Sequence, residues 1–371
     1  MNAAPPPLSQ VQWDAFVRAN PHGHVLQGWG WGSLKSAYGW AYERVGVWEG
    51  ETLVGAAQVL FRRLPFRLGT MAYLPMRPLI APQAYPDSTD PGDGEWYDDI
   101  GRKLWRAVDQ AARAHGAAFL KWEPGLTTDD MTQPDSLRMG RNGYMERFHF
   151  HPSPQTIQPP NTVVIEIAGD EEAILARMNQ GTRRKIRQSQ KHGIRYFQAA
   201  RVDVARFTAL MQVTGSRNAF GVHEAGYYEK AYDLFVPQDA ALILAEHEGD
   251  VLAGVFVFAV GAWAWYLYGA SASDKRNLMA SYGAQWAAIQ WAKARGCAYY
   301  DMWGIPDADP DTLEANFETR SDGLWGVYGF KRGWGGQVIR AAGAWDRVYN
   351  PVIYSAYKTA LRIRSRGHDD A

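Results

Sequence analysis

The feature that most constrains the fold of this chain is an internal duplication. EGETLVG at residues 49–55 resembles EGDVLAG at 248–254, and LWRAVDQAARAHGAAFLKWEPG at 104–125 resembles QWAAIQWAKARGCAYYDMWGIP at 285–306. Matching segments in the same order along both halves of a chain indicate one structural unit used twice. The length of 371 residues also suits two domains better than one.

Each copy is predicted to contain three strands, a helix and a final strand. In both copies the helical segment has apolar residues at three-to-four spacing, ends at a glycine, Gly116 or Gly296, and leads into a short apolar strand. Residues 82–100, rich in Pro, Gly and Asp, lengthen the first copy and are expected to form an extra surface loop. This order of elements is the core of acetyltransferase-like domains. The predicted fold class is α+β, with two tandem GNAT-like (acyl-CoA N-acyltransferase-like) domains.

One uncharged stretch, residues 251–273, is long enough to span a bilayer. The alternative is two buried strands with a turn at Gly261 and Ala262, since the flanking Val, Phe, Trp and Tyr residues favour strands. The corresponding run of the first copy contains Arg62 and Arg63, which a membrane span would not easily accommodate. We therefore predict a strand hairpin in both copies.

Composition narrows the kinds of partner and the compartment. Lys plus Arg and Asp plus Glu each number 39, so the whole chain has no electrostatic bias toward nucleic acid or acidic lipid, and any anion site must be local. The single cysteine, Cys297, excludes an intramolecular disulfide framework and a multi-cysteine zinc site, which agrees with a reducing compartment. The first residues have no apolar run typical of a secretory signal. We expect a cytoplasmic protein.

A strongly basic segment, residues 178–194, follows a predicted strand and a helix that Asp170 is expected to cap. The segment is expected to continue the helical region with a break at Gly181, and Ile186 is expected to point inward. Its cations recur at three-to-four spacing and would form a narrow basic stripe able to bind phosphates. These cations are Arg183, Arg184, Arg187 and Lys191. The alternative is a solvated helix face paired with acidic neighbours.

Five segments in fixed order resemble the FemABX family, the peptidyltransferases that add amino acids to peptidoglycan precursors. They are VLQGWGWGSLKSAYGW (25–40), the basic segment, TGSRNAFGVHEAGYY (214–228), YYDMWGIP (299–306) and GLWGVYGFKRGWGG (323–336). The resemblance implies tandem GNAT-like domains, here placed at 1–155 and 156–340, with a C-terminal helix in 341–371 that packs back on the first domain. No stretch fits the long helical arm of some members, so the chain is similar to the compact FemX-type members.

The resemblance further implies a reaction between two polyanionic reactants. An aminoacyl group would pass from aminoacyl-tRNA to the stem-peptide amine of a muramyl-pentapeptide precursor, either nucleotide-linked or lipid-linked. The chemistry is aminolysis of an activated ester, which mainly needs alignment of the reactants and stabilisation of charge on the tetrahedral intermediate. No covalent enzyme intermediate is required, no cofactor is expected, and the sequence contains no GxSxG elbow and no P-loop.

Two residues are the catalytic candidates that the resemblance implies. Lys331 matches the family's lysine near the reacting centre, where a cation could stabilise the oxyanion or the leaving ribose oxygen. The alternative is a solvated residue beside a glycine-rich turn. Glu123 matches an acidic position before proline in the precursor cleft, where a carboxylate could receive or orient the amine proton. Its counterpart region in the second copy offers Asp301, which could instead be structural.

Other matching positions imply substrate contacts. Lys35 and Arg217 match residues that hold the precursor's diphosphate, a role suited to a compact charge and to a planar fork of donors. Four tyrosines could stack on a sugar or base, with Tyr266 and Tyr268 expected on one strand face, or they could belong to the core. These tyrosines are Tyr227, Tyr228, Tyr266 and Tyr268. The basic stripe would bind the acceptor arm of the tRNA through backbone phosphates.

Three alternatives remain open from the sequence. The basic C-terminal segment could lie on an anionic inner membrane surface, or it could be a docked helix with its basic side in water. An acyl-CoA-dependent N-acyltransferase would need a glycine-rich turn that cradles phosphate, and QGTRRKI (180–186) offers one glycine. A non-catalytic protein that binds RNA or the precursor could also use the same duplicated fold.

Overall fold

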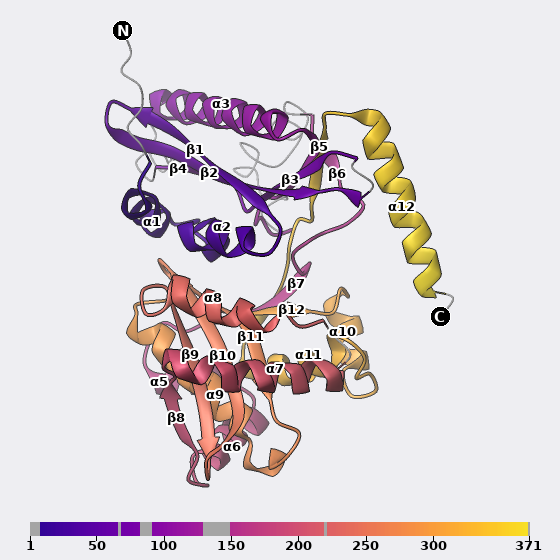
Figure 1. The fold of residues 1–371 in the computed structure, drawn as a ribbon. Coiled ribbons are helices and arrows are strands. Elements are labelled where there is room, and N and C mark those ends of the chain that lie inside the picture. Colours follow the sequence, from indigo (N-terminus) through magenta and orange to yellow (C-terminus); the bar gives the residue numbers. More distant parts are fainter. Residues whose placement is uncertain (1–7, 66–67, 82–90, 129–148, 219–220, 370–371) are drawn as a thin grey trace. The chain divides into compact units, whose positions relative to one another are not determined.

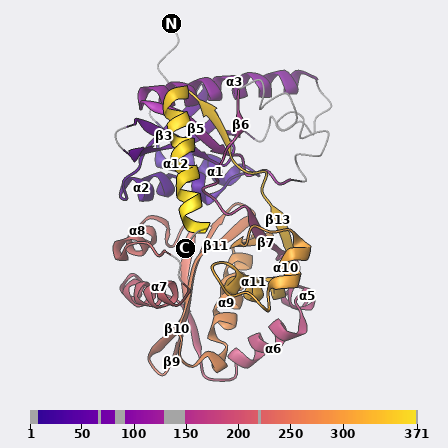
Figure 2. The same ribbon diagram turned by 90° about the vertical axis from the view of Figure 1, so that its right-hand side faces the viewer.

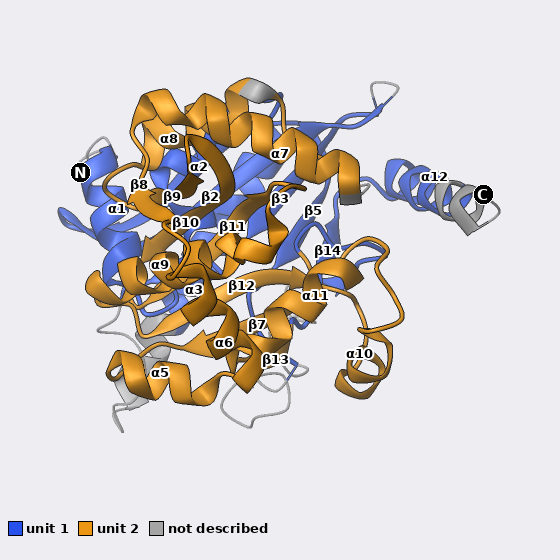
Figure 3. Cartoon of the chain, turned by 90° about the horizontal axis from the view of Figure 1, so that it is seen from below, with its two compact units in different colours: residues 1–158, 341–371 blue, residues 159–340 orange. Residues whose placement is uncertain are grey.

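The chain forms two compact units in the computed structural model, which describes residues 8–65, 68–81, 91–128, 149–218 and 221–369. Unit 1 comprises Met1–Gln158 and Ala341–Ala371, and unit 2 comprises Pro159–Arg340 (Figures 1 and 3). The C-terminal segment therefore belongs to the same unit as the N-terminal half.

Unit 1 is a mixed sheet with helices on both faces. The sheet order is β1-β2-β3-β5-β14-β6, with the short β4 paired to β2, and β3 with β5 is a parallel pair. Helix α3 lies over one face of β1 and β2, and α1 and α2 lie on the other (Figure 1). The elements are α1 (Gln10–Ala19), α2 (Trp29–Ser36), β1 (Ala41–Glu49), β2 (Thr52–Arg63), β3 (Thr70–Pro75), β4 (Leu79–Ile80), α3 (Pro91–Ala114), β5 (Ala117–Glu123), β6 (His151–Pro152), β14 (Trp345–Val348) and α12 (Pro351–Asp369).

Unit 2 has the same kind of layering. Its sheet order is β13-β7-β12-β11-β10-β9-β8, with α7 and α8 on one face and α6 and α9 on the other (Figure 2). The elements are β7 (Asn161–Glu166), α5 (Glu171–Arg177), α6 (Gln180–Ser189), β8 (Arg195–Gln198), α7 (Val204–Asn218), α8 (Ala225–Phe235), β9 (Ala240–His247), β10 (Asp250–Val260), β11 (Trp263–Ser271), α9 (Ala280–Ala294), β12 (Tyr299–Ile305), α10 (Pro310–Asn316), α11 (Trp325–Lys331) and β13 (Gln337–Arg340).

The duplication predicted from the sequence is confirmed. In each unit three antiparallel strands lead into a helix and then into a strand that returns parallel to the third, which gives β1-β2-β3-α3-β5 and β9-β10-β11-α9-β12. Gly116 and Gly296 follow the two helices with φ of 65° and 83°, a left-handed conformation that ends a helix at little cost for glycine. The α+β class with two tandem GNAT-like units is therefore correct.

The predictions for two local segments have different outcomes. Residues 251–273 form the hairpin β10–β11 with its turn at Gly261 and Ala262, as expected. No helix in the described part of the chain is long and apolar enough to cross a membrane. The prediction of an extra surface loop at 82–100 is wrong over its second half, because α3 already begins at Pro91. A proline suits the first helical position, since its missing N–H would have no partner there. Residues 82–90 lie outside the described residues.

A buried ion pair ties the C-terminal segment to β5 in unit 1. Lys121 Nζ lies 3.0 Å from Asp346 Oδ1, and the two side chains are 1% and 0% exposed. Burial lowers the pKa of Lys121, and Asp346 opposes that change. The other Asp346 oxygen accepts a hydrogen bond from Tyr354 of α12 at 2.9 Å. The same residue therefore joins β5, β14 and α12.

We predict that Asp346→Ala lowers the free energy of unfolding of unit 1 by about 3 to 5 kcal/mol, because it leaves the Lys121 ammonium buried without its counter-charge. Urea titration followed by tryptophan fluorescence measures the change. Asp322→Ala removes the carboxylate of an exposed ion pair with Arg320 and should leave the unfolding midpoint unchanged. Equal midpoints for Asp346→Ala and the wild type would show that the buried pair does not hold the segment.

Candidate functional site

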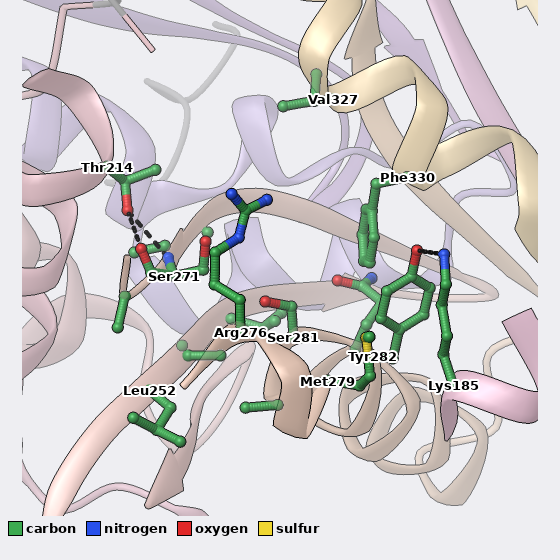
Figure 4. Close-up of a pocket in the computed structure, with 18 of the residues that line it drawn as sticks. Lys185, Thr214, Leu252, Ser271, Arg276, Met279, Ser281, Tyr282, Val327 and Phe330 are labelled. Carbon is green, nitrogen blue, oxygen red and sulfur yellow. Dashed lines mark hydrogen bonds between the residues drawn. The ribbon is translucent and has the colours of Figure 1, made fainter. Parts of the chain in front are cut away.

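A pocket of about 810 Å³ lies in unit 2 where two parallel strands separate. Strand β11 pairs with β12 only over Trp263–Trp265 and Tyr299–Asp301, and its remaining residues continue without β12. The end of β11, the start of α9, α7 and α11 line the space that opens (Figure 4). In unit 1 the equivalent strands stay paired over Thr70–Pro75, the full length of β3. The separation is thus a difference between the two copies.

Cations gather on the lining of this pocket. Arg217, at the end of α7, donates to Ser271 O and Oγ, both at 2.9 Å, so its guanidinium is held in place. Burial and then the neighbouring Arg276 lower the pKa of Arg217. Within the described part of the chain the Arg276 guanidinium has no hydrogen bond or ion pair. Two guanidiniums that act on one another electrostatically, on a lining that also includes Asp274, form a site suited to a phosphate group.

The loop that carries Arg276 has a strained backbone. Lys275 and Met279 flank the short 3-10 turn Arg276–Leu278, with φ of 52° and 58°. Left-handed conformations cost energy for residues other than glycine and cluster at binding sites. The loop leads directly into α9, whose first residues also line the pocket.

The opposite side of the pocket is aromatic and carries a lysine from the basic helix. Figure 4 shows Tyr282, Phe330 and Lys185 on one side, and Thr214 with Ser271 on the other. Lys185 Nζ donates to Tyr282 Oη at 3.0 Å. The pocket therefore has a basic end at Arg217 and an aromatic end that joins α6.

Lys331 lies behind the aromatic end. It is the last residue of α11, is 7% exposed, and donates to Gly304 O at 2.7 Å and to Trp303 O at 3.3 Å. Its Nζ is 5.7 Å from the centre of the Tyr266 ring, and Tyr266 lines the pocket. Burial lowers the pKa of Lys331 to about 7, against the opposing effect of Asp301. The burial contradicts the alternative of a solvated lysine beside a turn.

Glycines after Lys331 join α11 to the start of the basic helix. Gly335 has φ of 77°, and a Cβ at this position would lie 2.4 Å from Arg177 O. Gly333 O accepts a hydrogen bond from Asn179 N at 3.1 Å. Only a residue without a side chain fits this close approach, so the glycine-rich turn fixes where α11 ends.

The basic helix differs from the prediction at both ends. Asn179 Oδ1 accepts from Thr182 N at 2.7 Å and caps α6, so the break lies at 178–179 and Gly181 is inside the helix. Asparagine is a strong helix N-cap, and this overrides the glycine. Lys191 lies beyond the helix, and Arg183 donates to Met178 O. Ile186 is buried as predicted, and the exposed part of the stripe on α6 is Arg184 and Arg187.

The expectation that Tyr266 and Tyr268 share one face is wrong. Tyr266 pairs with Val257 while Tyr268 pairs with Phe256, so the strand contains one extra residue, Leu267. Such a bulge breaks the alternation of side chains and puts the two tyrosines on opposite faces.

The four candidate tyrosines separate accordingly. Tyr268 Oη is 3.0 Å from Tyr227 Oη, and both rings pack with Tyr228 on the face covered by α7 and α8. Tyr227 and Tyr228 are each 1% exposed, which matches the alternative interpretation of these residues as core. Tyr266 is the member of the four that lines the pocket.

Lys35 and Glu123 lie in unit 1. Lys35, on α2, has its Nζ 4.6 Å from the Trp31 ring centre, and burial and then Arg62 lower its pKa to about 8. Glu123 ends β5 and accepts hydrogen bonds from Ile157 N at 2.6 Å and from Tyr73 Oη. Burial raises the pKa of Glu123. Through these contacts Glu123 holds the chain at Ile157, just before unit 2 begins, against β3 and β5.

Two pocket residues, Arg276 and Lys185, are not among the site candidates predicted from the sequence. Arg276 belongs to DKR (274–276), a charged triplet between a long uncharged hairpin and a predicted helix. That abrupt change in polarity was the available signal, because loops that carry binding residues often sit on rigid elements. Lys185 lies within the basic segment 178–194, but its inward direction depends on where α6 begins.

Comparisons with known proteins agree on one family. A sequence model of the FemAB family matches residues 8–134, 150–250 and 246–362. The lipid II:glycine glycyltransferase of Staphylococcus saprophyticus is 25% identical over 412 aligned residues, covering 92% of each protein. That of Staphylococcus aureus strain MRSA252 is 24% identical over 418, covering 94% of this chain and 93% of the relative.

Solved structures support the same architecture. FemX superposes with a TM-score of 0.79 at 22% identity, covering 94% of this chain and 98% of FemX. A tandem GNAT protein from the clavulanic acid biosynthesis pathway gives a TM-score of 0.51 at 13% identity, covering 92% of this chain and 95% of that protein. At these identities the structures show the fold.

We predict that Gly335→Ala lowers the free energy of unfolding of unit 2 by at least about 1 to 3 kcal/mol, because alanine is strained at this φ and its Cβ would meet Arg177 O. Gly329→Ala is the matched control in α11, since its Cβ would only touch Phe317 at 3.9 Å. The control should gain up to about 1 kcal/mol from helix propensity. Thermal unfolding of both variants tests this, and similar midpoints would contradict the role of the turn.

Proposed function

The chain belongs to the FemAB family and is a transferase, and we propose that it moves an aminoacyl group from an aminoacyl-tRNA to the stem-peptide amine of a peptidoglycan precursor. The names of the staphylococcal relatives support a lipid-linked acceptor over a nucleotide-linked one. The product would carry an added residue of an interpeptide bridge.

The observation that carries the proposal is the buried Lys331 ammonium beside a pocket with cations on its lining. Attack of an amine on the ester carbonyl forms the C–N bond and puts negative charge on the carbonyl oxygen. Breaking the C–O bond then returns the electron pair to the ribose oxygen, which takes up the proton that the attacking nitrogen loses. A cation in a site of low polarity stabilises both charges strongly, and its position costs no reorganisation during the reaction.

The two ends of the pocket suit the two reactants. The aromatic end lies beside Lys331, and Lys185 connects it to α6, the helix that also carries the exposed Arg184 and Arg187. We assign this end to the aminoacylated end of the tRNA. The basic end, where Arg217 is fixed beside Arg276, suits the precursor's diphosphate. Lys35 of unit 1 stays a proposed contact of the precursor's diphosphate on the family resemblance, and burial and then Arg62 lower the pKa of its ammonium to about 8.

A lipid-linked acceptor places the reaction at a membrane surface. We propose that the protein is cytoplasmic and contacts the inner face of the membrane peripherally through its acceptor. The helix α12 packs on Phe119 of β5 through Tyr354 and Tyr357. That contact suits a docked helix whose basic side faces water, rather than one laid on lipid.

We predict that the purified protein transfers labelled amino acid from tRNA to a lipid-linked precursor without coenzyme A. Lys331→Met should reduce kcat by about 100-fold to 1000-fold, as expected when one charge-stabilising group is removed. Lys230→Met changes an exposed lysine of α8 and should leave the rate unchanged. Transfer that requires an acyl-CoA donor, or a fully active Lys331→Met, would contradict the proposal.

We also predict that binding of the aminoacyl-tRNA weakens steeply as salt is added. The double variant Arg184→Gln and Arg187→Gln should bind more weakly, and its log–log salt slope should be smaller by roughly 0.7 to 0.9 per arginine removed. The charge-matched control changes Lys230 and Lys293, on α8 and α9, to glutamine. An equal loss of affinity in the control, or no dependence on salt, would exclude α6 as the RNA-binding element.

A further inference from the structure

Strand β12 is irregular where it passes Lys331. Its pairing with β7 shifts register between Asp301 and Gly304, and Trp303 has a left-handed φ of 64°. A bulky residue other than glycine adopts that conformation only where its surroundings impose it. The irregularity also comes just after Asp301, the last residue of β12 that pairs with β11.

The Asp301 carboxylate stabilises this turn. Asp301 is 9% exposed, and its Oδ1 accepts hydrogen bonds from Trp303 N at 2.6 Å and from the Thr162 hydroxyl of β7. A carboxylate that accepts a backbone N–H two residues later fixes the direction of the peptide between them. The turned backbone then presents two successive carbonyls, Trp303 O and Gly304 O, to Lys331 Nζ.

Asp301 is also the negative charge that faces Lys331. The neighbouring strand β11 contributes Tyr266, which is neutral because burial raises its pKa to about 12. On the other side of α11, Arg332 is paired with Glu314 of α10, and these two charges largely cancel. Burial raises the pKa of Asp301 to about 6 and lowers that of Lys331 to about 7. Both pKa values therefore lie near neutral pH, and each charge favours the ionised form of its partner.

We propose that Asp301 is a positioning residue for Lys331, because its carboxylate both shapes the turn that cradles the ammonium and supplies the charge that keeps the lysine protonated. The inference rests on the proposed role of Lys331 in the transfer reaction. The Asp301 carboxylate is buried and accepts hydrogen bonds from Trp303 N and the Thr162 hydroxyl, so its effect on the reactants is assigned to its action on Lys331.

Asp301→Asn separates these two effects. The amide keeps an oxygen that can accept both hydrogen bonds, from Trp303 N and from Thr162, while the negative charge is lost. Without the charge, Lys331 releases its proton at lower pH. The direction of this change follows from the wild-type protein, in which the Asp301 carboxylate raises the pKa of Lys331. At a fixed pH near 7, less of the variant carries the cation.

The experiment measures the titration of Lys331 and the pH profile of transfer. Lysine labelled with ¹³C is followed by NMR, and the Lys331 signal is assigned by its absence in Lys331→Met. In Asp301→Asn the Lys331 titration should move to lower pH by about one unit. The rate at pH 7 should fall about threefold to tenfold and recover toward that of the wild type near pH 5.5, where Asp301 itself is protonated. KM for the precursor should change little.

Glu314→Gln is the matched control. It also removes one negative charge next to α11, but this carboxylate pairs with Arg332 and does not face Lys331. Its Lys331 titration and pH profile should be those of the wild type. The wild-type protein gives a second test that needs no folded variant, because the Lys331 signal should show a smaller inflection near pH 6 when Asp301 titrates.

The outcomes distinguish a failure of this inference from a failure of the proposed function on which it rests. An unchanged Lys331 titration in Asp301→Asn overturns the inference, as does a rate reduced equally at every pH, which a merely structural aspartate would give. A wild-type Lys331 signal without the inflection near pH 6 overturns it as well. Full activity of Lys331→Met would instead overturn the proposed function, while the NMR titration would still decide whether Asp301 controls the lysine.

Discussion

The parting of β11 from β12 after three paired residues is the constraint on which the site depends. Where the strands stay together, as β3 and β5 do in unit 1, side chains and ladder hydrogen bonds occupy the space between them. Where they separate, carbonyls at the end of β12 need other donors, and the unpaired end of β11 lines a pocket together with α7, α9 and α11. Lys331 supplies those donors from α11. One departure from regular pairing thus provides both the cavity and the position of its cation.

The two copies use the same buried position for different purposes. Lys121 in unit 1 and Asp301 in unit 2 occupy matching places in the repeat, five residues after the glycines that end α3 and α9. Lys121 pairs with Asp346 and holds the C-terminal segment in place. Asp301 faces Lys331, whose charge the proposed reaction needs. A buried charge must be paired in either case, and the partner decides whether the pair supports structure or chemistry.

The sequence predicted the fold well because the signals for it are local and repeated. Hydrophobic spacing, the glycines at 116 and 296 and the cap at Asp170 each specify an element boundary without reference to the rest of the chain. The wrong predictions concern places where a contact with a distant part of the chain overrides the local sequence preference. The bulge at Leu267 depends on how β11 meets β10, and the start of α6 depends on Asn179 and its contact with Gly333.

The candidate site was predicted only in part for the same reason. Lys331 and Arg217 were found through the family resemblance, and both lie at the pocket or directly behind it. Arg276 and the turn at Trp303 were not found, because their importance comes from a left-handed backbone that nothing in the local sequence requires. Tyr227 and Tyr228 were overvalued, since an aromatic residue that could stack on a ligand can equally pack in a core.

The most direct test of the central claim is where the donor binds. A short RNA ending in an adenosine with an amide-linked amino acid cannot react, so it reports binding alone. NMR of the labelled protein should show shifts of Lys331, Tyr266 and Tyr282 when this RNA is added, and no shift for Tyr299 at the far end of β12. Saturable binding that leaves Lys331, Tyr266 and Tyr282 unperturbed would contradict the assignment of this pocket to the aminoacyl donor.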